Sequence, residues 1–149
     1  MINRVIESNI INQLRDWRKI IVLYGARQVG KTTLIDKIIQ NFEGRILSIN
    51  ADEQLYNETL SSRDFSKLRG MVEGYDLLFI DEAQRIVDIG INLKILHDKI
   101  PKLKIIITGS SSLDLANRVS EPLTGRIYIK TLYPVSVLEW QEKELLNDF

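Results

Sequence analysis

The sequence has 149 residues, 44% of them apolar, with twenty basic and twenty acidic side chains and no cysteine. This length predicts one domain with a single core, and the zero net charge gives no overall field for nucleic acid or an anionic membrane, although it allows a local basic patch. The lack of cysteine excludes disulfides and thiolate metal sites, and no apolar run has the length of a signal peptide or a membrane span, so we expect a cytoplasmic protein.

The chain begins with an amphipathic pattern that predicts a helix packed beside a sheet. Its apolar positions are Ile2, Val5, Ile6, Ile10, Leu14 and Trp17. A short apolar run over residues 19–24 follows and is rich in β-branched side chains. This run is typical of a strand that is buried on both faces.

The segment after this strand has the spacing G-x-x-x-x-G-K-T of a phosphate-binding loop. Gly25 and Gly30 have no Cβ to block the approach of backbone N–H groups to phosphate. We expect the ammonium of Lys31 at the β- and γ-phosphates and the hydroxyl of Thr32 at magnesium. The residues expected to contact the nucleotide are Gly25, Ala26, Arg27, Gln28, Val29, Gly30, Lys31, Thr32 and Thr33, the last mainly as part of the next helix. A chance glycine-rich turn is the alternative, and the strand and helix on either side of the loop argue against it.

Beyond the loop, helical and strand patterns alternate along the chain. Helices are predicted at residues 31–41, in a short segment after 51–53, around 65–72, over a stretch containing Leu93, Leu96 and Ile100, and from Ser136 onward. Strands are predicted at residues 45–50, 76–81, 103–108 and 126–131. Gly44 and Gly74 mark helix ends, Pro101 ends the helix that contains Leu93, and Ser136 with Glu139 forms a capping box.

The strand patterns also predict the order of the sheet. The first, third and fourth strands are continuously apolar and belong in the centre of a parallel sheet. The second and fifth carry polar residues and belong at its edges. We therefore expect an α/β, three-layer fold of the P-loop NTPase type, with a parallel five-stranded sheet in the order 5-1-4-3-2 and right-handed crossovers.

The third strand ends in two carboxylates, Asp81 and Glu82. In a phosphate-loop enzyme, Asp81 would hold magnesium, usually through water, and Glu82 would polarise the attacking water as a general base. Two acids at a solvated strand end are common by themselves. Their pairing with a phosphate loop on another strand of the same sheet favours the catalytic interpretation.

Small hydroxyl side chains follow the fourth strand, where they would lie beside both motifs. Either Thr108 or Ser110 is predicted to contact the γ-phosphate or the attacking water as a sensor of hydrolysis. The sequence does not choose between the two. Serine runs also suit turns and helix caps, which is the structural alternative.

Together these motifs resemble a prokaryotic family of AAA-type ATPase domains in the AAA+ superfamily. The resemblance rests on Gly25-Ala-Arg-Gln-Val-Gly-Lys-Thr-Thr, Phe79-Ile-Asp-Glu-Ala-Gln, Thr108-Gly-Ser-Ser-Ser, Leu123-Thr-Gly-Arg and Tyr133-Pro-Val-Ser, and covers nearly the whole chain. It implies that ATP is the substrate, that Mg²⁺ is the cofactor and that the products are ADP and phosphate.

The resemblance also implies two further sites. Asn50 occupies the position at which many AAA+ proteins keep a polar residue that holds the glutamate inactive until a partner binds. An arginine supplied in trans often stabilises the transferring phosphoryl group, which would require a homo-oligomer. Arg126 is the first candidate for this arginine and Arg118 the second; a surface arginine or an edge-strand charge is the alternative.

One departure concerns the end of the chain. Members of this family continue into a further domain, and the sequence leaves no room for the helical lid that AAA+ proteins use to cover the base. We therefore expect residues 1–149 to be a fragment or a truncated form of the ATPase core, lacking the lid and the C-terminal domain. Its turnover in isolation would then be slow.

Three rival functions compete with that of an ATPase. A GTPase lacks support because the chain has no Asn-Lys-x-Asp motif, and a helicase needs two nucleotide-binding lobes although Asp81-Glu-Ala-Gln84 resembles a helicase motif. A module that binds ATP as a switch, with little or no hydrolysis, remains open.

Other conspicuous side chains receive a structural interpretation. His97 is expected to be a partly exposed helix residue, and Trp17 and Trp140 to be packing anchors. A solvated helix face is expected at Arg63, Lys67 and Arg69, which leaves nucleic-acid binding uncertain.

Overall fold

The computed structural model describes residues 8, 10–12, 18–25, 31–110 and 112–131, and for residues 31, 32 and 112–114 it describes the backbone alone. The strands are β1 (Ile20–Tyr24), β2 (Ile46–Asn50), β3 (Leu77–Asp81), β4 (Lys104–Gly109) and β5 (Ile127–Thr131). The helices are α2 (Lys31–Gln40), α3 (Asn57–Leu60), α4 (Phe65–Val72), η1 (Ala83–Arg85), α5 (Ile89–Lys99) and α6 (Ser112–Val119).

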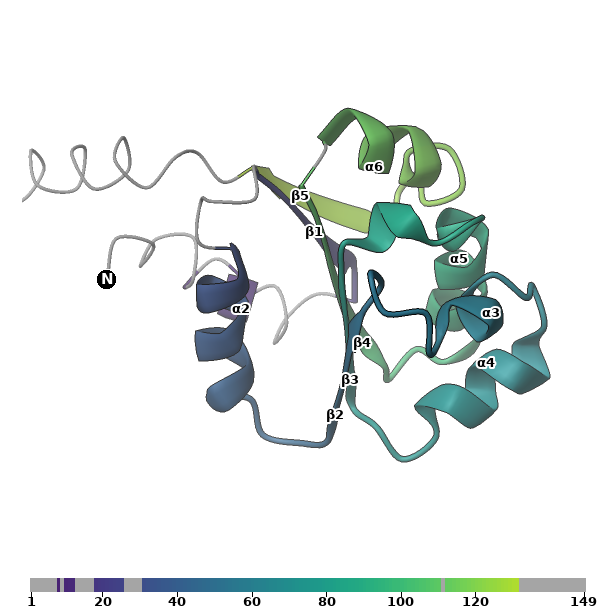
Figure 1. The fold of residues 1–149 in the computed structure, drawn as a ribbon. Helices are drawn as coiled ribbons and strands as arrows, with labels where there is room; N and C mark the ends of the chain where they lie inside the picture. Colours follow the sequence, from purple (N-terminus) through teal and green to yellow (C-terminus); the bar gives the residue numbers. More distant parts are fainter. Residues whose placement is uncertain (1–7, 9, 13–17, 26–30, 111, 132–149) are drawn as a thin grey trace, which may run out of the picture.

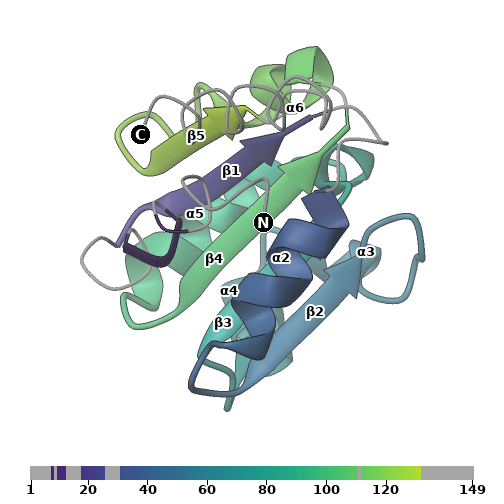
Figure 2. The same cartoon turned by 90° about the vertical axis from the view of Figure 1, so that its left-hand side faces the viewer.

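The five strands form one parallel sheet in the order β2-β3-β4-β1-β5, which confirms the predicted order (Figure 2). Every residue of β1 is buried, and β3 and β4 are buried at all but one position each. Each edge strand exposes two alternate positions near its carboxyl end, Ser48 and Asn50 in β2 and Ile129 and Thr131 in β5. The central strands are continuously apolar because helices cover both of their faces.

Two apolar layers hold the helices against the sheet. Helix α2 covers one face, where Leu34, Ile35 and Ile38 pack with Ile21 and Leu23 of β1. Helices α3, α4, α5 and α6 cover the other face (Figure 1). The result is a three-layer α/β fold, as the sequence predicts.

The described part of the N-terminal segment agrees with the predicted opening helix. Residues 8 and 10–12 are helical, and Ile10 is fully buried in the layer beneath α2. The predicted helix from Ser136 lies outside the described residues, as do Trp17 and Trp140.

Helix α6 is not among the helices that the sequence patterns predict, although the serine run before it suits a helix cap. The helix is stabilised by packing, because Leu115 and Val119 lie four residues apart on one side and are fully buried in the layer with α5. The short turn of helix η1 was likewise expected to be loop. Both depend on contacts with the sheet that a local pattern does not contain.

Parallel pairing brings the ends of four strands to one edge of the sheet. Asn50 of β2 is in register with Asp81 of β3, and Tyr24 of β1 is in register with Gly109 of β4. This carboxyl edge therefore collects the segments in which the sequence places its chemistry.

The helices are short, and α5, with 11 residues, is the longest that the structure describes. No helix within the described residues is long and apolar enough to cross a membrane.

Two glycines, one at a buried and one at an exposed helix position, offer a test of the packing between α5 and α6. A Cβ at Gly90 would lie 2.3 Å from the carbonyl oxygen of Arg118 and 3.0 Å from Cγ of Pro122. We expect Gly90→Ala to lower the free energy of unfolding by about 1–3 kcal/mol, because the helices must separate. A Cβ at Gly70 in α4 would meet nothing within 4 Å, so Gly70→Ala is expected to raise it by about 0.5–1 kcal/mol. Urea denaturation of both variants measures the difference, and equal effects would contradict the close approach of α5 to α6.

Candidate active site

The exit of β1 and the start of α2 flank the predicted phosphate loop. The N–H of Gly25 donates to the carbonyl oxygen of Gly109 at 3.2 Å, which extends the pairing of β1 with β4 one residue beyond the strand. Helix α2 begins at Lys31, so its N-terminus lies at the carboxyl edge of the sheet. Residues 26–30 and the side chains of Lys31 and Thr32 lie outside the described part, and their contacts remain predictions. Thr33 is exposed on α2.

Asp81 ends β3 and is held by the neighbouring strand. The hydroxyl of Thr108 donates to Oδ1 of Asp81 at 2.5 Å. Thr108 is only 1% exposed, and Asp81 is half-buried. A hydrogen bond to a charged carboxylate is stronger than one between neutral groups, so this contact orients the Asp81 side chain.

The backbone turns sharply at Glu82, which has the left-handed conformation (φ 56°, ψ 45°) that is uncommon for residues other than glycine. Two hydrogen bonds hold this turn: the Glu82 N–H donates to Oγ1 of Thr108 at 3.4 Å, and the Arg85 N–H donates to the Glu82 carbonyl oxygen at 3.0 Å. Such conformations persist where the surroundings over-determine them, and they cluster at functional sites.

The carboxylate of Glu82 belongs to a buried polar cluster. Its Oε2 accepts hydrogen bonds from Oγ of Ser110 at 2.7 Å and from Nε2 of Gln84 at 2.6 Å. Glu82 and Gln84 are each 8% exposed. The structure thus brings together Asp81, Glu82, Thr108 and Ser110, all of which were predicted from the sequence.

Gln84 is the site residue that sequence reasoning missed. The sequence places it in Asp81-Glu-Ala-Gln84, which resembles a helicase motif, but this resemblance alone gives Gln84 no role. The available signal was an amide side chain two residues after the expected general base. Its contact with Glu82 depends on the turn of η1, which the strand pattern did not predict.

Asn50 lies beside Asp81 in the sheet register, at the carboxyl end of β2. Its Oδ1 accepts a hydrogen bond from the N–H of Asp52 at 3.0 Å, as short polar side chains do in turns. The predicted restraint of Glu82 by Asn50 stays a prediction.

Arg126 precedes β5 and therefore lies at the amino edge of the sheet, opposite the carboxyl edge. Its guanidinium donates from Nε and Nη2 to the two carboxylate oxygens of Asp98, at 2.9 and 3.0 Å. Arg118 is exposed in the last turn of α6. Both remain predicted candidates for an arginine acting in trans, and Arg126 would have to leave Asp98 to act there.

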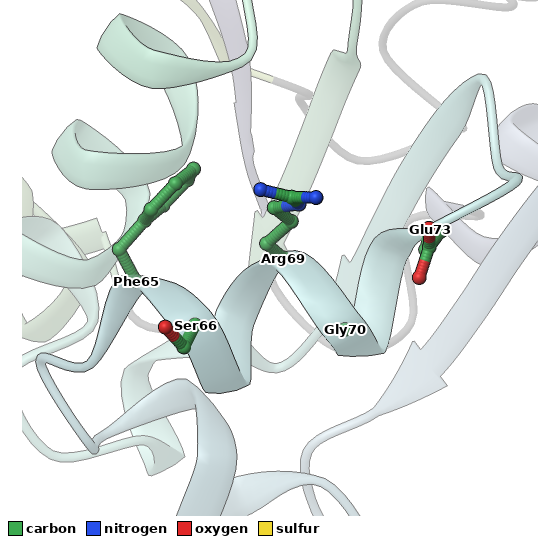
Figure 3. Close-up of a pocket in the computed structure, with 5 residues that line it drawn as sticks. All are labelled: Phe65, Ser66, Arg69, Gly70 and Glu73. Atoms are coloured by element: carbon green, nitrogen blue, oxygen red, sulfur yellow. The ribbon is translucent and has the colours of Figure 1, made fainter.

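Two surface hollows of about 260 and 480 Å³ lie along α4 and share Phe65, Arg69 and Glu73 among their lining residues. Figure 3 shows the smaller one, with these side chains projecting from the helix. In the larger one, the ammonium of Lys99 lies 4.9 Å from the centre of the Phe65 ring. None of the predicted site residues lines either hollow. The hollows therefore lie away from the acidic and hydroxyl side chains that favour the carboxyl edge as the functional site.

A family profile described as an AAA domain matches residues 17–141. The chain belongs to this family. The match spans both flanks of the phosphate loop, the acidic strand and the segment leading to β5.

The relatives of this AAA domain include two uncharacterized proteins. One, from Methanocaldococcus jannaschii, is 33% identical over an alignment of 135 residues that covers 84% of this chain and 28% of the relative. Another, from Mycobacterium tuberculosis, is 32% identical over an alignment of 122 residues that covers 79% of this chain and 26% of the relative. The chain thus spans little more than a quarter of the length of these relatives.

Several solved structures share the fold. A DNA replication initiation factor is 21% identical with a TM-score of 0.63, covering 98% of this chain and 51% of that one. The Walker-type ATPase of Pyrococcus abyssi is 20% identical with a TM-score of 0.60, covering 89% of this chain and 53% of that one. DnaA from Aquifex aeolicus, solved with AMPPCP, is 19% identical with a TM-score of 0.60, covering 99% and 51%. The three-layer fold predicted from the sequence is therefore that of P-loop ATPases.

Replacing Thr108 by valine tests the link between the two acidic residues. Valine has the same shape but leaves Oδ1 of Asp81 and the N–H of Glu82 without the hydroxyl. We expect Thr108→Val to reduce the free energy of unfolding by about 1–3 kcal/mol, since buried polar groups lose a partner. Thr59→Val in α3 is the matched control and should change it by less than about 0.5 kcal/mol. Equal stability of the two variants by urea denaturation would contradict a structural role for the Thr108 hydroxyl.

The ion pair between Arg126 and Asp98, at the amino edge of the sheet, makes the stability of the fold depend on pH. The hydrogen bond from Arg126 lowers the pKa of Asp98 below its ordinary value. The pair therefore stabilises the fold at pH values above the ordinary pKa of an aspartate. This stabilisation is lost as the pH falls through the lower pKa that Asp98 has in the folded protein. We expect Arg126→Gln to raise the pKa of Asp98 in an NMR titration of its carboxyl carbon, whereas Arg69→Gln leaves it unchanged. A pKa that does not respond to Arg126→Gln would show that the pair is absent in solution.

Proposed function

We propose that this AAA domain binds Mg-ATP through residues 25–33 and hydrolyses it to ADP and phosphate, coupling turnover to a conformational change. The observation that carries the proposal is the position of Asp81 and Glu82. Both lie at the edge of the sheet where β1 ends at Gly25 and α2 begins at Lys31. A phosphate chain held between β1 and α2 would face both carboxylates across β4.

Binding of the triphosphate is supported by the geometry around the loop. The N-terminus of α2 carries the positive end of the helix dipole and free backbone N–H groups, which attract phosphate. Lys31 would add its ammonium at the β- and γ-phosphates. The structures of DnaA with AMPPCP support a triphosphate analogue as the type of ligand for this fold.

The donor set at the site fits magnesium. Mg²⁺ takes oxygen ligands and is held in such sites by one or two side chains, with phosphate oxygens and waters completing the shell. Asp81 offers a half-buried carboxylate that Thr108 already orients, and Thr32 would offer its hydroxyl. Bound there, the ion would neutralise charge on the β- and γ-phosphates.

Glu82 would act as the general base. It accepts a proton from the attacking water as the water oxygen bonds to the γ-phosphorus, and the bond between that phosphorus and the β,γ-bridging oxygen breaks, leaving ADP and phosphate. Thr108 and Ser110 contact Asp81 and Glu82 respectively, so each could report the state of the γ-phosphate through a carboxylate. Asn50 as a restraint on Glu82, and Arg126 or Arg118 of a second copy, complete the proposed machinery.

Two substitutions separate binding from hydrolysis. Lys31→Ala is expected to weaken ATP binding about 10–100-fold, since a charged hydrogen bond to phosphate is worth about 1.5–3 kcal/mol. Glu82→Gln is expected to bind Mg-ATP as the parent does and to lose about 10²–10⁴-fold in turnover, the usual contribution of a general base. Calorimetric titration measures the affinity, and phosphate release measures turnover.

Lys37→Ala is the matched control, because Lys37 lies in the last turn of the same helix, away from the carboxyl edge. Binding by Lys31→Ala that equals binding by Lys37→Ala would refute the assigned loop. A parent that binds ATP without any turnover for Glu82→Gln to remove would instead identify a nucleotide-dependent switch.

A further inference from the structure

The side-chain amide of Gln84 is buried beside the carboxylate that we assign to water activation. Its Nε2 lies 2.6 Å from Oε2 of Glu82 and 3.4 Å from Oγ of Ser110. Ser110 itself donates to the same Oε2 at 2.7 Å. Two neutral donors thus converge on one carboxylate oxygen in a site that is nearly closed to solvent.

The orientation of this amide follows from Glu82. If the amide were turned over, its Oε1 would face the carboxylate, and two acceptors would repel each other. In the observed orientation, Oε1 is buried and has no hydrogen-bond partner among the residues that the structure describes. A buried acceptor without a partner destabilises a fold. Its presence indicates that the hydrogen bond from Nε2 to Glu82 stabilises this orientation by more than the unpaired Oε1 costs.

The end of β4 leaves room for the amide. A Cβ at Gly109 would lie 2.8 Å from Oε1 of Gln84 and 2.7 Å from Cδ2 of Leu115 in α6. Any larger residue at Gly109 would therefore press on the amide or on α6. Gly109 and Leu115 together shape a slot that holds the Gln84 side chain against Glu82.

We propose that Gln84 is a positioning residue that orients the Glu82 carboxylate for proton transfer from the attacking water. The inference rests on the proposed ATPase function and extends it to a residue that touches neither phosphate nor metal. Gln84 fixes Oε2 from one side and Ser110 fixes it from another, so the plane of the carboxylate is set before nucleotide binds. A general base that is already oriented loses less conformational entropy in the transition state.

Gln84→Leu tests this role, because leucine fills the slot without a donor. We expect kcat to fall about 10–100-fold, as when other partners that orient a catalytic group are removed, while KM and the affinity for Mg-ATP change less than about threefold. The stoichiometry of Mg-ATP binding in the same titration should stay that of the parent, which separates a displaced carboxylate from a smaller folded fraction.

Gln84→Glu supplies a second signature. Glutamate keeps the length and shape of the side chain but places a carboxylate oxygen where Oε2 of Glu82 needs a donor, and the two acceptors repel each other. We expect kcat to fall at least as far as in Gln84→Leu while Mg-ATP still binds, which a change in packing alone would not produce.

Gln40→Leu, at the exposed end of α2, is the matched control and should keep the parent's kcat and KM. Turnover by Gln84→Leu or Gln84→Glu equal to or above that of the parent overturns the role of Gln84 alone. If the parent shows no turnover that Lys31→Ala removes, the ATPase proposal fails first and the role of Gln84 falls with it. The two failures are therefore distinguishable in one set of measurements.

Discussion

The hydroxyl group of Thr108 links the two acidic residues of the site. It donates to the Asp81 carboxylate and accepts from the Glu82 N–H, so a β4 side chain fixes the point at which β3 ends and the chain turns. The link exists because β3 and β4 pair in parallel, with Ile80 in register with Ile107. If β4 were shifted by one residue, Thr108 would point to the other face and neither acid would be held.

From this link, the left-handed backbone of Glu82 and the turn of η1 follow. The sharp turn directs the chain back across the end of β4, which brings Gln84 to Ser110 and both to the Glu82 carboxylate. Side chains from two strand ends and one helical turn therefore form a single buried polar cluster. A cluster of this kind is rigid when its members bond to one another, and rigidity is what a general base requires of its surroundings.

The opposite edge of the sheet has a different character. Arg126 pairs with Asp98 through two parallel hydrogen bonds, and the hollows along α4 combine exposed charges with the ring of Phe65. These contacts join α5 to the start of β5 and α4 to α5 across the outer layer. A further exposed ion pair, between Arg85 and Asp52 at 3.2 Å, lies at the carboxyl edge itself, so ion pairs occur at both edges of the sheet.

The sequence by itself determined the order of the strands and placed the two acids at a strand end, because continuous apolar runs mark central strands and because motif spacing is local. The phosphate-binding role of residues 25–33 stays a prediction from that spacing. The sequence also pointed to Thr108 and Ser110, since residues that follow a parallel strand meet at the same edge. Only the tertiary structure decided the rest. Helix α6 forms because Leu115 and Val119 find a buried layer, Gln84 meets Glu82 because η1 turns, and Arg126 meets Asp98 across 28 residues of chain. Each of these depends on the distance between segments that are remote in sequence, and no local periodicity records that distance.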